Sequence, residues 1–351
     1  MKEKRLVYNI DYPQLRDIFI SWGEPAYRTD QFWQGLYSQL WNVSGQFTTL
    51  PVSLRNKIDE KFSFGHLNPV TTMKSSDAET VKTLFQLPDR NAVEAVIMKY
   101  HKRRTLCIST QAGCAMGCVF CATGQMGLQR NLSSGEIVEQ VMYYARHLSE
   151  IDERVTNIVF MGMGEPFHNY DATMGAIDLL NRHNGFNFGA RRITISTVGI
   201  VPAIQRFTKE KRQVNLAISL HAIDDDMRTN LLPINRRYPV DLLLDTCKDY
   251  VRFTRRRISI EWALIRGVND SVNLAKELVR KLKMFKINGA MLCHVNIIPL
   301  NPTTGYVRVR TTRKQALLFS EELSGGGIPC SIRLRRGIDI QAGCGQLAIK
   351  V

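Results

Sequence analysis

The segment "STQAGCAMGCVFCAT" carries three cysteines, Cys114, Cys118 and Cys121, within eight positions. Thiolates are soft ligands that suit iron–sulfur clusters or zinc. Three thiols can hold three corners of a cubane cluster and leave the fourth iron open to a ligand that is not protein. A structural zinc would need a fourth Cys or His close by, and neither of the two nearest histidines forms a second pair with a cysteine. The spacing therefore predicts one [4Fe–4S] cluster with three cysteine ligands, with zinc as the alternative.

A glycine and a carboxylate follow at the end of the next predicted strand. The stretch "FMGMGEP" contains Gly164 and Glu165. Glycine lets the backbone approach a ligand closely, and a carboxylate can bind an ammonium group. An ordinary strand-to-loop turn would also explain this stretch, so it gains weight only from its place one strand after the cysteine loop.

Two other cysteines could react. Cys107 lies seven residues before Cys114, and Cys344 lies between Gly343 and Gly345 in "GIDIQAGCGQL". The flanking glycines let this segment bend, so the Cys344 thiol could reach an active site. The alternative for both is a buried, inert cysteine, which is how we interpret the remaining three, Cys247, Cys293 and Cys330.

Charge and composition favour a polyanionic partner. The chain has 351 residues, a formal net charge of +15, and an ordinary 44% of hydrophobic residues. A basic excess suits nucleic acid, although a merely soluble basic surface is the alternative. Basic stretches that could hold phosphates, or be solvated faces, are "HKRR" (101–104), "KEKR" (209–212), "TRRR" (254–257) and "RLRR" (333–336).

The start of the chain and its hydropathy give an expected location. "MKEKRLVYNIDYP" has no apolar leader region, and no apolar run approaches membrane-spanning length. We therefore expect a cytoplasmic protein that does not bind membranes. Structural disulfides are rare in that compartment, which favours metal or redox chemistry for the eight cysteines.

Alternating strands and helices must position these residues. Three helical stretches occupy roughly the first sixty residues, and "TVKTLFQL" and "AVEAVIMKY" then predict a hairpin. Helices are predicted at 134–148, 239–256 and 271–285, the first opened by a capping box of Ser133 and Glu136. The predicted strands are "TLCIST", "TNIVFMGM", "RRITIST", "VNLAISL", "RISIEWAL" and "MLCHVNII".

Six strand–helix repeats predict an α/β fold with a curved, partly closed parallel sheet, because they are too few for an eight-stranded barrel. We divide the chain into a small N-terminal helical domain (1–65), a β-hairpin extension (66–106), a partial (β/α)6 barrel (107–330) and a C-terminal segment carrying Cys344 (331–351). The last part is expected to be a strand that runs into the glycine-flanked cysteine.

The C-x3-C-x2-C spacing resembles the signature of radical S-adenosylmethionine (SAM) enzymes. This resemblance implies a partial (β/α)6 barrel with the cysteine loop after its first strand. It also implies that the open iron binds the amino and carboxylate groups of SAM, and that one electron cleaves the sulfonium to release a 5′-deoxyadenosyl radical.

A longer set of phrases is similar to the RNA adenine methyltransferases of the RlmN/Cfr family. The similarity runs from about Thr80 to the C-terminus, and the small helical domain also fits. The phrases are "RTLCISTQAGCAMGCVFCATGQMGLQRNL", "FMGMGEP", "ISTVGIVP", "SLHA", "LLPINRRYP", "RGVNDS", "HVNIIPLNP" and "GIDIQAGCGQL".

This resemblance assigns SAM-binding residues. It implies that Gly164 and Glu165 contact the methionine part of SAM. Other positions that match SAM contacts are Ser196, Ser219, Leu220, His221 and Asn301. Each lies near the C-terminal end of a predicted strand, where barrel sites form. Without the resemblance, Ser196 and His221 would be interpreted as hydrogen-bonded residues at the edge of the core.

The resemblance also implies a route to carbon 2 of adenine, an electrophilic carbon with no electron pair for ordinary methyl transfer. Cys344 receives a methyl group from one SAM, and a second SAM supplies the radical that takes a hydrogen from it. Glu94, in "VEAV", matches the residue that removes the ring proton, although on its own it could be a solvated strand residue. Cys107 matches the thiol that frees Cys344 through a transient disulfide.

The implied substrates are an adenosine in 23S rRNA and the adenosine 3′ of the tRNA anticodon, which must be unstacked to react. The implied partners are these RNAs and an electron donor such as flavodoxin or ferredoxin, and we expect a monomer. A sister group that methylates carbon 8 is the alternative. A glycyl-radical activase would use the same loop without needing Cys344 or Cys107, and a non-catalytic iron–sulfur RNA sensor would produce no deoxyadenosine.

Overall fold

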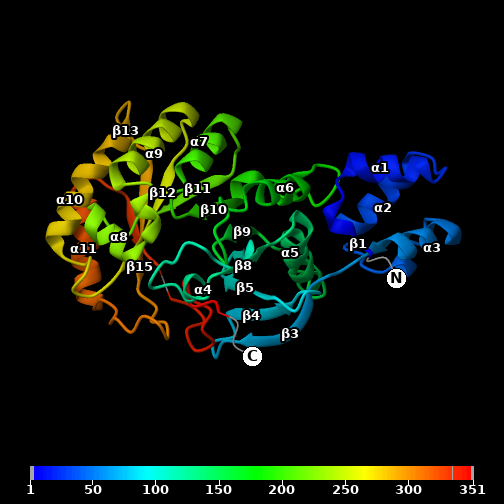
Figure 1. The fold of residues 1–351 in the computed structure, drawn as a ribbon, viewed down its shortest axis with the longest axis horizontal. Helices are drawn as coiled ribbons and strands as arrows, with labels where there is room; N and C mark the ends of the chain where they lie inside the picture. The colour runs from blue at the N-terminus through cyan, green and yellow to red at the C-terminus, as the bar shows by residue number, and fades with distance from the viewer. Residues whose placement is uncertain (1–3, 334, 349–351) are drawn as a thin grey trace.

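The computed structural model describes residues 4–333 and 335–348. Its N-terminal part is a lobe of three helices, α1 (Tyr12–Ser21), α2 (Tyr27–Tyr37) and α3 (Val52–Lys61), as the sequence predicts. Two short parallel strands, β1 (Arg5–Leu6) and β2 (Phe62–Ser63), close the lobe. Buried aromatic side chains fill its core, among them Phe19, Phe32 and Trp33. Figure 1 shows this lobe projecting from one side of the molecule.

A ten-stranded sheet forms the body, in the order β16-β15-β12-β11-β10-β9-β6-β5-β4-β3. The six strands predicted for the barrel are all present and pair in parallel. They are β6 (Arg103–Cys107), β9 (Asn157–Phe160), β10 (Ile193–Thr197), β11 (Asn215–Ser219), β12 (Ile258–Leu264) and β15 (Cys293–Pro299). The predicted α/β class and partial barrel are therefore confirmed.

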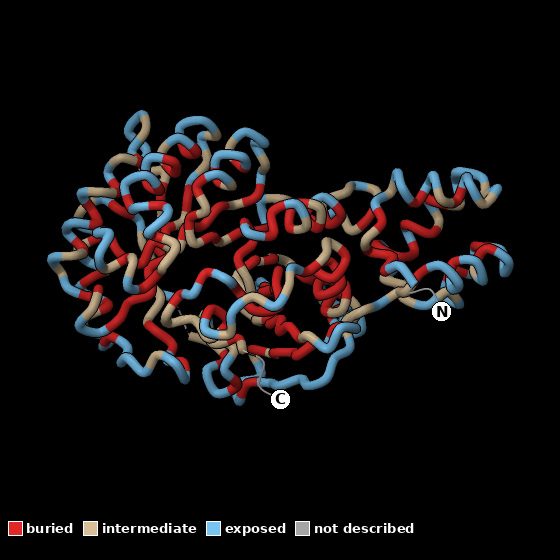
Figure 2. The backbone as a smooth tube through the Cα atoms, viewed as in Figure 1, coloured by how far each residue is buried: buried red, intermediate tan, exposed pale blue. Residues whose placement is uncertain are grey.

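Antiparallel strands extend the sheet beyond β6. The predicted hairpin is β4 (Thr80–Gln86) and β5 (Ala92–Tyr100), and β3 (Asn68–Lys74) adds an edge that the sequence analysis did not delimit. Every residue of β3 is exposed, whereas β4 and β5 are mostly buried, as the colours of Figure 2 show.

Helices connect the parallel strands and cover the outside of the sheet (Figure 1). Helix α5 begins in the predicted capping box, where the Ser133 hydroxyl accepts from the Glu136 backbone N–H. The crossover helices are α5 (Ser134–Ser149), α6 (Tyr170–Asn181), α7 (Val201–Glu210), α8 (Asp225–Leu231), α9 (Val240–Thr254), α10 (Val272–Leu282) and α11 (Arg313–Gly325). None of the helices in the described ranges has the length and hydrophobicity needed to cross a lipid bilayer.

The cysteine loop has more structure than the sequence analysis expected. Strand β7 (Gln111–Gly113) pairs with β8 (Leu128–Asn131), and the short helix α4 (Ala122–Gln125) lies between them. Gly113 has a φ of +74°, and a Cβ there would lie 1.9 Å from the Gly127 carbonyl oxygen. Only glycine therefore allows the loop to close on itself at this point.

The C-terminal segment departs from its prediction. Strand β16 (Cys330–Ile332) is only three residues long, and residues 335–348 form turns rather than a continued strand. Three hydrogen bonds fix the end of this segment. The Gly345 carbonyl accepts from the Ala122 N–H (2.7 Å), the Leu347 carbonyl from the Thr123 hydroxyl (2.6 Å), and the Cys344 carbonyl from Asn301 Nδ2 (3.2 Å). The tail therefore crosses the barrel and lies against the cysteine loop.

Asn269 fixes the loop after β12 to the loop after β11. Its Nδ2 donates to the carbonyls of His221 (2.8 Å) and Ala263 (2.7 Å), and its Oδ1 accepts from the Ile265 N–H (2.7 Å). The side chain is fully buried, so each of these groups would lose its partner without access to water if Asn269 were replaced.

We predict that Asn269→Leu lowers the free energy of unfolding by about 3 kcal/mol or more, because it leaves buried polar groups unpaired. Thermal unfolding of the anaerobically prepared protein measures this loss as a lower melting temperature. Asn273→Leu, on the exposed side of α10, is the control and should melt like the parent. Equal melting temperatures for both variants would contradict this role of Asn269.

Candidate active site

The three cysteines of the loop lie close together. Cys114 follows β7, Cys118 lies in the middle of the loop, and Cys121 precedes α4. Cys114 and Cys118 are buried. Burial raises the pKa of Cys114 to about 12, and the pKa of Cys118 is raised by burial and by the other two thiols. Thiols bind iron as thiolates, so loading this site releases protons.

The donor set fits a cubane cluster. Within the described ranges, no group of three or more His, Cys, Asp or Glu side chains converges on one metal ion. A cubane places each cysteine on a different iron, so its ligands need not converge on a single point. Three neighbouring thiols on a glycine-rich loop therefore suit a cluster with one iron not bound by protein.

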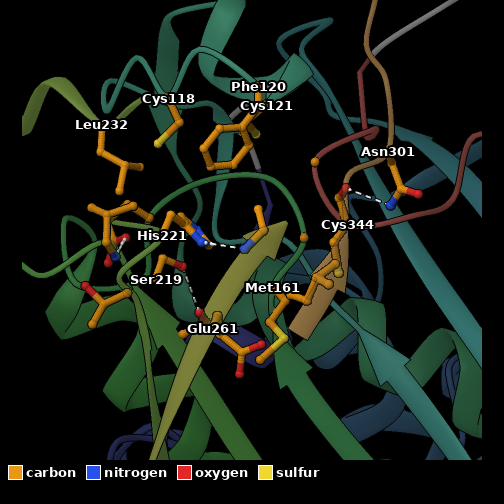
Figure 3. A pocket seen from close by; sticks show the side chains of 18 of the residues that line it. Cys118, Phe120, Cys121, Met161, Ser219, His221, Leu232, Glu261, Asn301 and Cys344 are labelled. Carbon is orange, nitrogen blue, oxygen red and sulfur yellow. Dashed lines mark hydrogen bonds between the residues drawn. The ribbon is translucent and has the colours of Figure 1, made fainter. Parts of the chain in front are cut away.

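A first cavity of about 890 Å³ opens beside this loop. It brings together most of the residues that the sequence predicts for SAM and the cluster. The predicted residues that line it are Cys118, Cys121, Gly164, Glu165, Ser196, Ser219, His221, Asn301 and Cys344. Leu220 does not line it, because its side chain is buried in the main core. Figure 3 shows Cys118, Cys121, His221 and Cys344 around this cavity.

Glu165 lies buried where β9 and β10 end. Its carboxylate accepts from the backbone N–H groups of Phe167 (2.9 Å) and Val198 (2.9 Å), which fixes its direction. Burial raises the pKa of Glu165 to about 7, and these two hydrogen bonds oppose that shift. A carboxyl group held in this way can bind an ammonium group that enters the cavity.

His221 is neutral and has a defined tautomer. Its Nδ1 accepts from the Ala263 N–H (2.9 Å), so the ring proton lies on Nε2. Burial and the charge of Arg228 lower the pKa of His221 to about 3. Phe120 from the cysteine loop packs edge-on against the ring, with centroids 5.1 Å apart. His221 therefore offers a hydrogen-bond donor rather than a charge.

A second cavity of about 1300 Å³ lies inside the barrel, lined by β5, β6, β9, β12, β15 and the C-terminal segment. Four arginines line it, namely Arg103, Arg333, Arg335 and Arg336, and Glu261 is its one carboxylate among the described residues. Arg103 and Arg336 both lie over the Tyr100 ring, at 5.0 and 4.4 Å from its centroid. This positive lining suits an anionic ligand.

The two cavities meet at a shared set of side chains. Both are lined by Met161, Glu261, Ile298, Asn301 and Cys344. The accessible surface of Cys344 therefore faces two spaces, one beside the cysteine loop and one inside the barrel. A group carried on this sulfur could be received on one side and delivered on the other.

Cys107 lies near Cys344 inside the barrel. It ends β6, is buried, and lines the second cavity together with Cys344. Burial raises the pKa of the Cys107 thiol, and the nearby Cys344 raises it further. All eight cysteines are free thiols. Of the three cysteines for which the sequence predicts no reaction, Cys247 and Cys293 are fully buried, as expected, and Cys330 is partly buried beneath α11.

Glu94 is not a solvated residue. It is buried in β5, and its carboxylate forms an ion pair with Lys82 Nζ (2.9 Å). Burial raises the pKa of Glu94, while Lys82 and the Ala348 backbone N–H lower it. Glu94 is not among the described residues that line either cavity, and the Ala348 backbone of the C-terminal segment lies next to its carboxylate.

The sequence analysis missed the polar group inside the barrel. Glu261 lies in the predicted strand "RISIEWAL", where a carboxylate within an apolar run was a signal that it did not use. Asn296 and Met161 were also not singled out. Two of the four basic stretches, 101–104 and 333–336, contribute arginines to the second cavity. In the others, Arg212 pairs with Asp178 and Glu210, and Arg256 donates to Gln213 and Asn215.

Comparisons with known proteins agree with this fold. The model of the radical SAM superfamily matches residues 108–279. A crystal structure of a radical SAM methyltransferase from Sphaerobacter thermophilus is 46% identical, has a TM-score of 0.94, and covers 98% of this chain and 99% of that chain. The fold and the cysteine loop define a radical SAM enzyme, which uses a [4Fe–4S] cluster and SAM.

Similar sequences narrow the class further. A probable dual-specificity RNA methyltransferase RlmN from Chloroflexus aurantiacus is 46% identical over 99% of this chain and 93% of its own length. The dual-specificity RNA methyltransferase RlmN 1 of Myxococcus xanthus is 44% identical over 98% of this chain and 94% of its own. This chain belongs to the RlmN family of radical SAM RNA methyltransferases.

We predict that Lys82→Met destabilises the protein by about 3 to 5 kcal/mol, because it leaves the buried Glu94 carboxylate without its cation. The loss should be greater at pH 8 than at pH 5. Without Lys82 the pKa of Glu94 in the folded state rises further. The folded protein then favours the protonated carboxyl group, so it loses stability as the pH rises through this pKa and Glu94 ionises. Thermal unfolding at both pH values measures the effect.

The matched control removes an exposed ion pair. Arg206→Met breaks the contacts with Asp171 and Glu210, and because the arginine is half exposed to solvent, its effect should be much smaller and nearly independent of pH. If Lys82→Met were as mild as Arg206→Met at both pH values, the buried pair would not hold Glu94 in the way described.

Proposed function

We propose that this enzyme methylates carbon 2 of an adenosine in 23S rRNA and of the adenosine 3′ of the anticodon in tRNA, with Cys344 as the carrier of the methyl group. The observation that carries the proposal is the position of Cys344 where the two cavities meet, with Cys107 beside it. The names of the Chloroflexus and Myxococcus relatives support an RNA substrate and dual specificity.

The first cavity takes the cofactors. Cys114, Cys118 and Cys121 would hold one cluster, and Gly164, Glu165, Ser196, Ser219, His221 and Asn301 would bind SAM. Leu220, buried in the core, would position its neighbours Ser219 and His221. When bound, the cluster and two SAM molecules per turnover supply a methyl group and then a radical that abstracts hydrogen. The Glu165 carboxyl would bind the ammonium group of SAM, and His221 would donate a hydrogen bond from Nε2 without adding a positive charge to the cavity.

Cys344 and Cys107 then act in sequence. The Cys344 sulfur would accept the methyl group, which would give one hydrogen atom to the radical and bond through its carbon to carbon 2 of the adenine. The adduct would then return one electron to the oxidised cluster and give the carbon-2 proton to a base, which leaves a methylene bridge. Cys107 attacks the Cys344 sulfur, so that an S–S bond forms, the S–CH2 bond breaks, and the methylene carbon keeps the electron pair and takes up a proton. A thiol reductant must reopen the disulfide before the next turnover.

Glu94 is the proposed acceptor of the carbon-2 proton. Burial raises its pKa and so makes it a stronger base, while its ion pair with Lys82 favours the ionised form that can accept a proton. Because the C-terminal segment lies next to Glu94, this role requires residues 341–348 to move when RNA binds. Lys82 also donates to the Gln341 carbonyl (3.4 Å), which links this carboxylate to the start of that segment.

The rest of the proposal concerns organisation and partners. We propose that the chain has four functional parts: the N-terminal lobe (1–65), the sheet extension (66–106), the catalytic barrel (107–330) and the segment that carries the methyl group (331–351). The enzyme acts as a cytoplasmic monomer and receives electrons from a flavodoxin or ferredoxin. Light scattering of the purified chain should give the mass of one 40.0 kDa chain.

We predict that alanine at Cys114, Cys118 or Cys121 removes most of the bound iron, because two thiolates cannot retain a cubane with an open corner. Iron and sulfide analysis of anaerobically reconstituted protein measures this. Cys330→Ala, outside both cavities, is the control and should bind as much iron as the parent. Full iron content in all three loop variants, or zinc in place of iron, would refute the proposed ligands.

We predict that the reconstituted enzyme converts adenosine to 2-methyladenosine in unmodified 23S rRNA and tRNA, as measured by nucleoside mass spectrometry. Cys344→Ala should give no product because it has no methyl carrier. Cys107→Ala should accumulate an RNA–protein adduct because nothing displaces the Cys344 sulfur. 8-Methyladenosine would reassign the enzyme to the sister group, and full activity of Cys344→Ala would overturn the carrier role.

A further inference from the structure

Glu261 is a buried carboxyl group that the proposed chemistry does not use. It lies in the middle of β12, faces the barrel interior, and is almost inaccessible to solvent. Burying a carboxylate is costly unless it is paired, and among the described residues Glu261 has no ion pair with Lys, Arg or His. Packing alone therefore gives no reason for an acidic residue here.

A chain of hydrogen bonds fixes the Glu261 carboxyl group. Its Oε1 accepts from Asn296 Nδ2 (2.7 Å) on the adjacent strand β15. Asn296 Oδ1 accepts in turn from the Ser331 hydroxyl (3.2 Å), which also contacts His294 Nε2 (2.9 Å). Three strands thus hold the carboxyl in one orientation, which is typical of a group that recognises a ligand.

The carboxyl group faces the place where the methyl group would be transferred. Glu261 lines both cavities, as does Cys344, and its charge contributes to raising the pKa of the Cys344 thiol. In Figure 3 the Glu261 side chain lies beside Met161, below Cys344. A base whose carbon 2 meets Cys344 would therefore lie with one of its edges within reach of Glu261.

We propose that Glu261, held by Asn296, recognises the Watson–Crick edge of the target adenine by accepting a hydrogen bond from its 6-amino group, and so selects adenine over guanine. This inference rests on the proposed function, because it assumes that an adenine enters the second cavity. The 6-amino group and carbon 2 lie on the same six-membered ring, so one residue can bind that edge while Cys344 approaches carbon 2.

The chemistry of the two purines makes this contact selective. Adenine presents an amino donor at position 6, whereas guanine presents a carbonyl oxygen that a carboxyl oxygen would repel. Asn296 Nδ2 donates to Glu261 Oε1, which fixes this oxygen as an acceptor whether the carboxyl group is ionised or neutral. Oε1 can therefore accept from the 6-amino group of adenine and has no proton to offer the carbonyl of guanine.

The remaining lining fits the rest of a nucleotide. Arg103, Arg333, Arg335 and Arg336 line the same cavity and can bind the flanking phosphates, which position a nucleotide without reading its sequence. Among the described side chains that line this cavity, only Glu261 carries a carboxyl group, which can accept a hydrogen bond from the base. The arginines therefore bind the phosphates, and Glu261 recognises the base.

The test compares a stem-loop RNA carrying adenosine at the target position with the same RNA carrying purine riboside, which lacks the 6-amino group. The parent enzyme should methylate the purine RNA with a kcat/KM about 10- to 100-fold lower. Glu261→Leu should lose about the same factor on the adenosine RNA, and the purine substitution should then cost nothing further. Glu261→Gln should keep most activity, because an amide oxygen also accepts from the amino group.

Two readouts separate this role from others. S-methylation of Cys344 without RNA should be unchanged in Glu261→Leu, and loss of that methylation would make Glu261 a SAM-binding residue and overturn the inference. Unchanged discrimination against purine RNA in Glu261→Leu would also overturn it. Glu277→Leu, on the exposed side of α10, is the control and should discriminate like the parent. If the parent methylates neither RNA, the proposed function fails instead.

Discussion

The structure depends on fixing one sulfur atom between two cavities. Cys344 is far from the cysteine loop in the sequence. The Ala122 N–H and the Thr123 hydroxyl of that loop donate to carbonyls of its segment, and the Asn301 side chain donates to the Cys344 carbonyl. These bonds hold the main chain around Cys344 rather than its side chain, so the thiol stays available. The barrel then supplies a cofactor side and a basic side, and the sulfur borders both.

The two cavities differ in the charge of the side chains that line them. The first cavity contains Glu165 and neutral His221, a setting that suits a cation such as SAM. The second is lined by four arginines and suits a polyanion such as RNA. Glu261 and Asn301 border both spaces, and Asn301 also accepts from Arg335 Nε (2.8 Å). The same few residues therefore connect the cavity beside the cysteine loop, the Cys344 thiol and the basic lining.

Much of this could be predicted from the sequence, because period-two and helical patterns report local structure directly. The six barrel strands, the hairpin and the capping box at Ser133 follow from such patterns. The β7–β8 pairing and the turns of 335–348 do not, since long-range hydrogen bonds rather than local propensity stabilise them. Glu94 and Glu261 are further examples. A carboxylate in a predicted strand does not reveal whether it will be buried in the fold or will line a cavity.

The central claim is that the methyl group passes through Cys344 and loses a hydrogen there. The most direct measurement supplies SAM with a fully deuterated methyl group and determines the isotopes in the methylated RNA by mass spectrometry. A carrier that gives up one deuterium and regains a solvent proton predicts a product methyl with two deuterium atoms and one hydrogen. A product that retains all three deuterium atoms would mean direct transfer to RNA and would contradict the account.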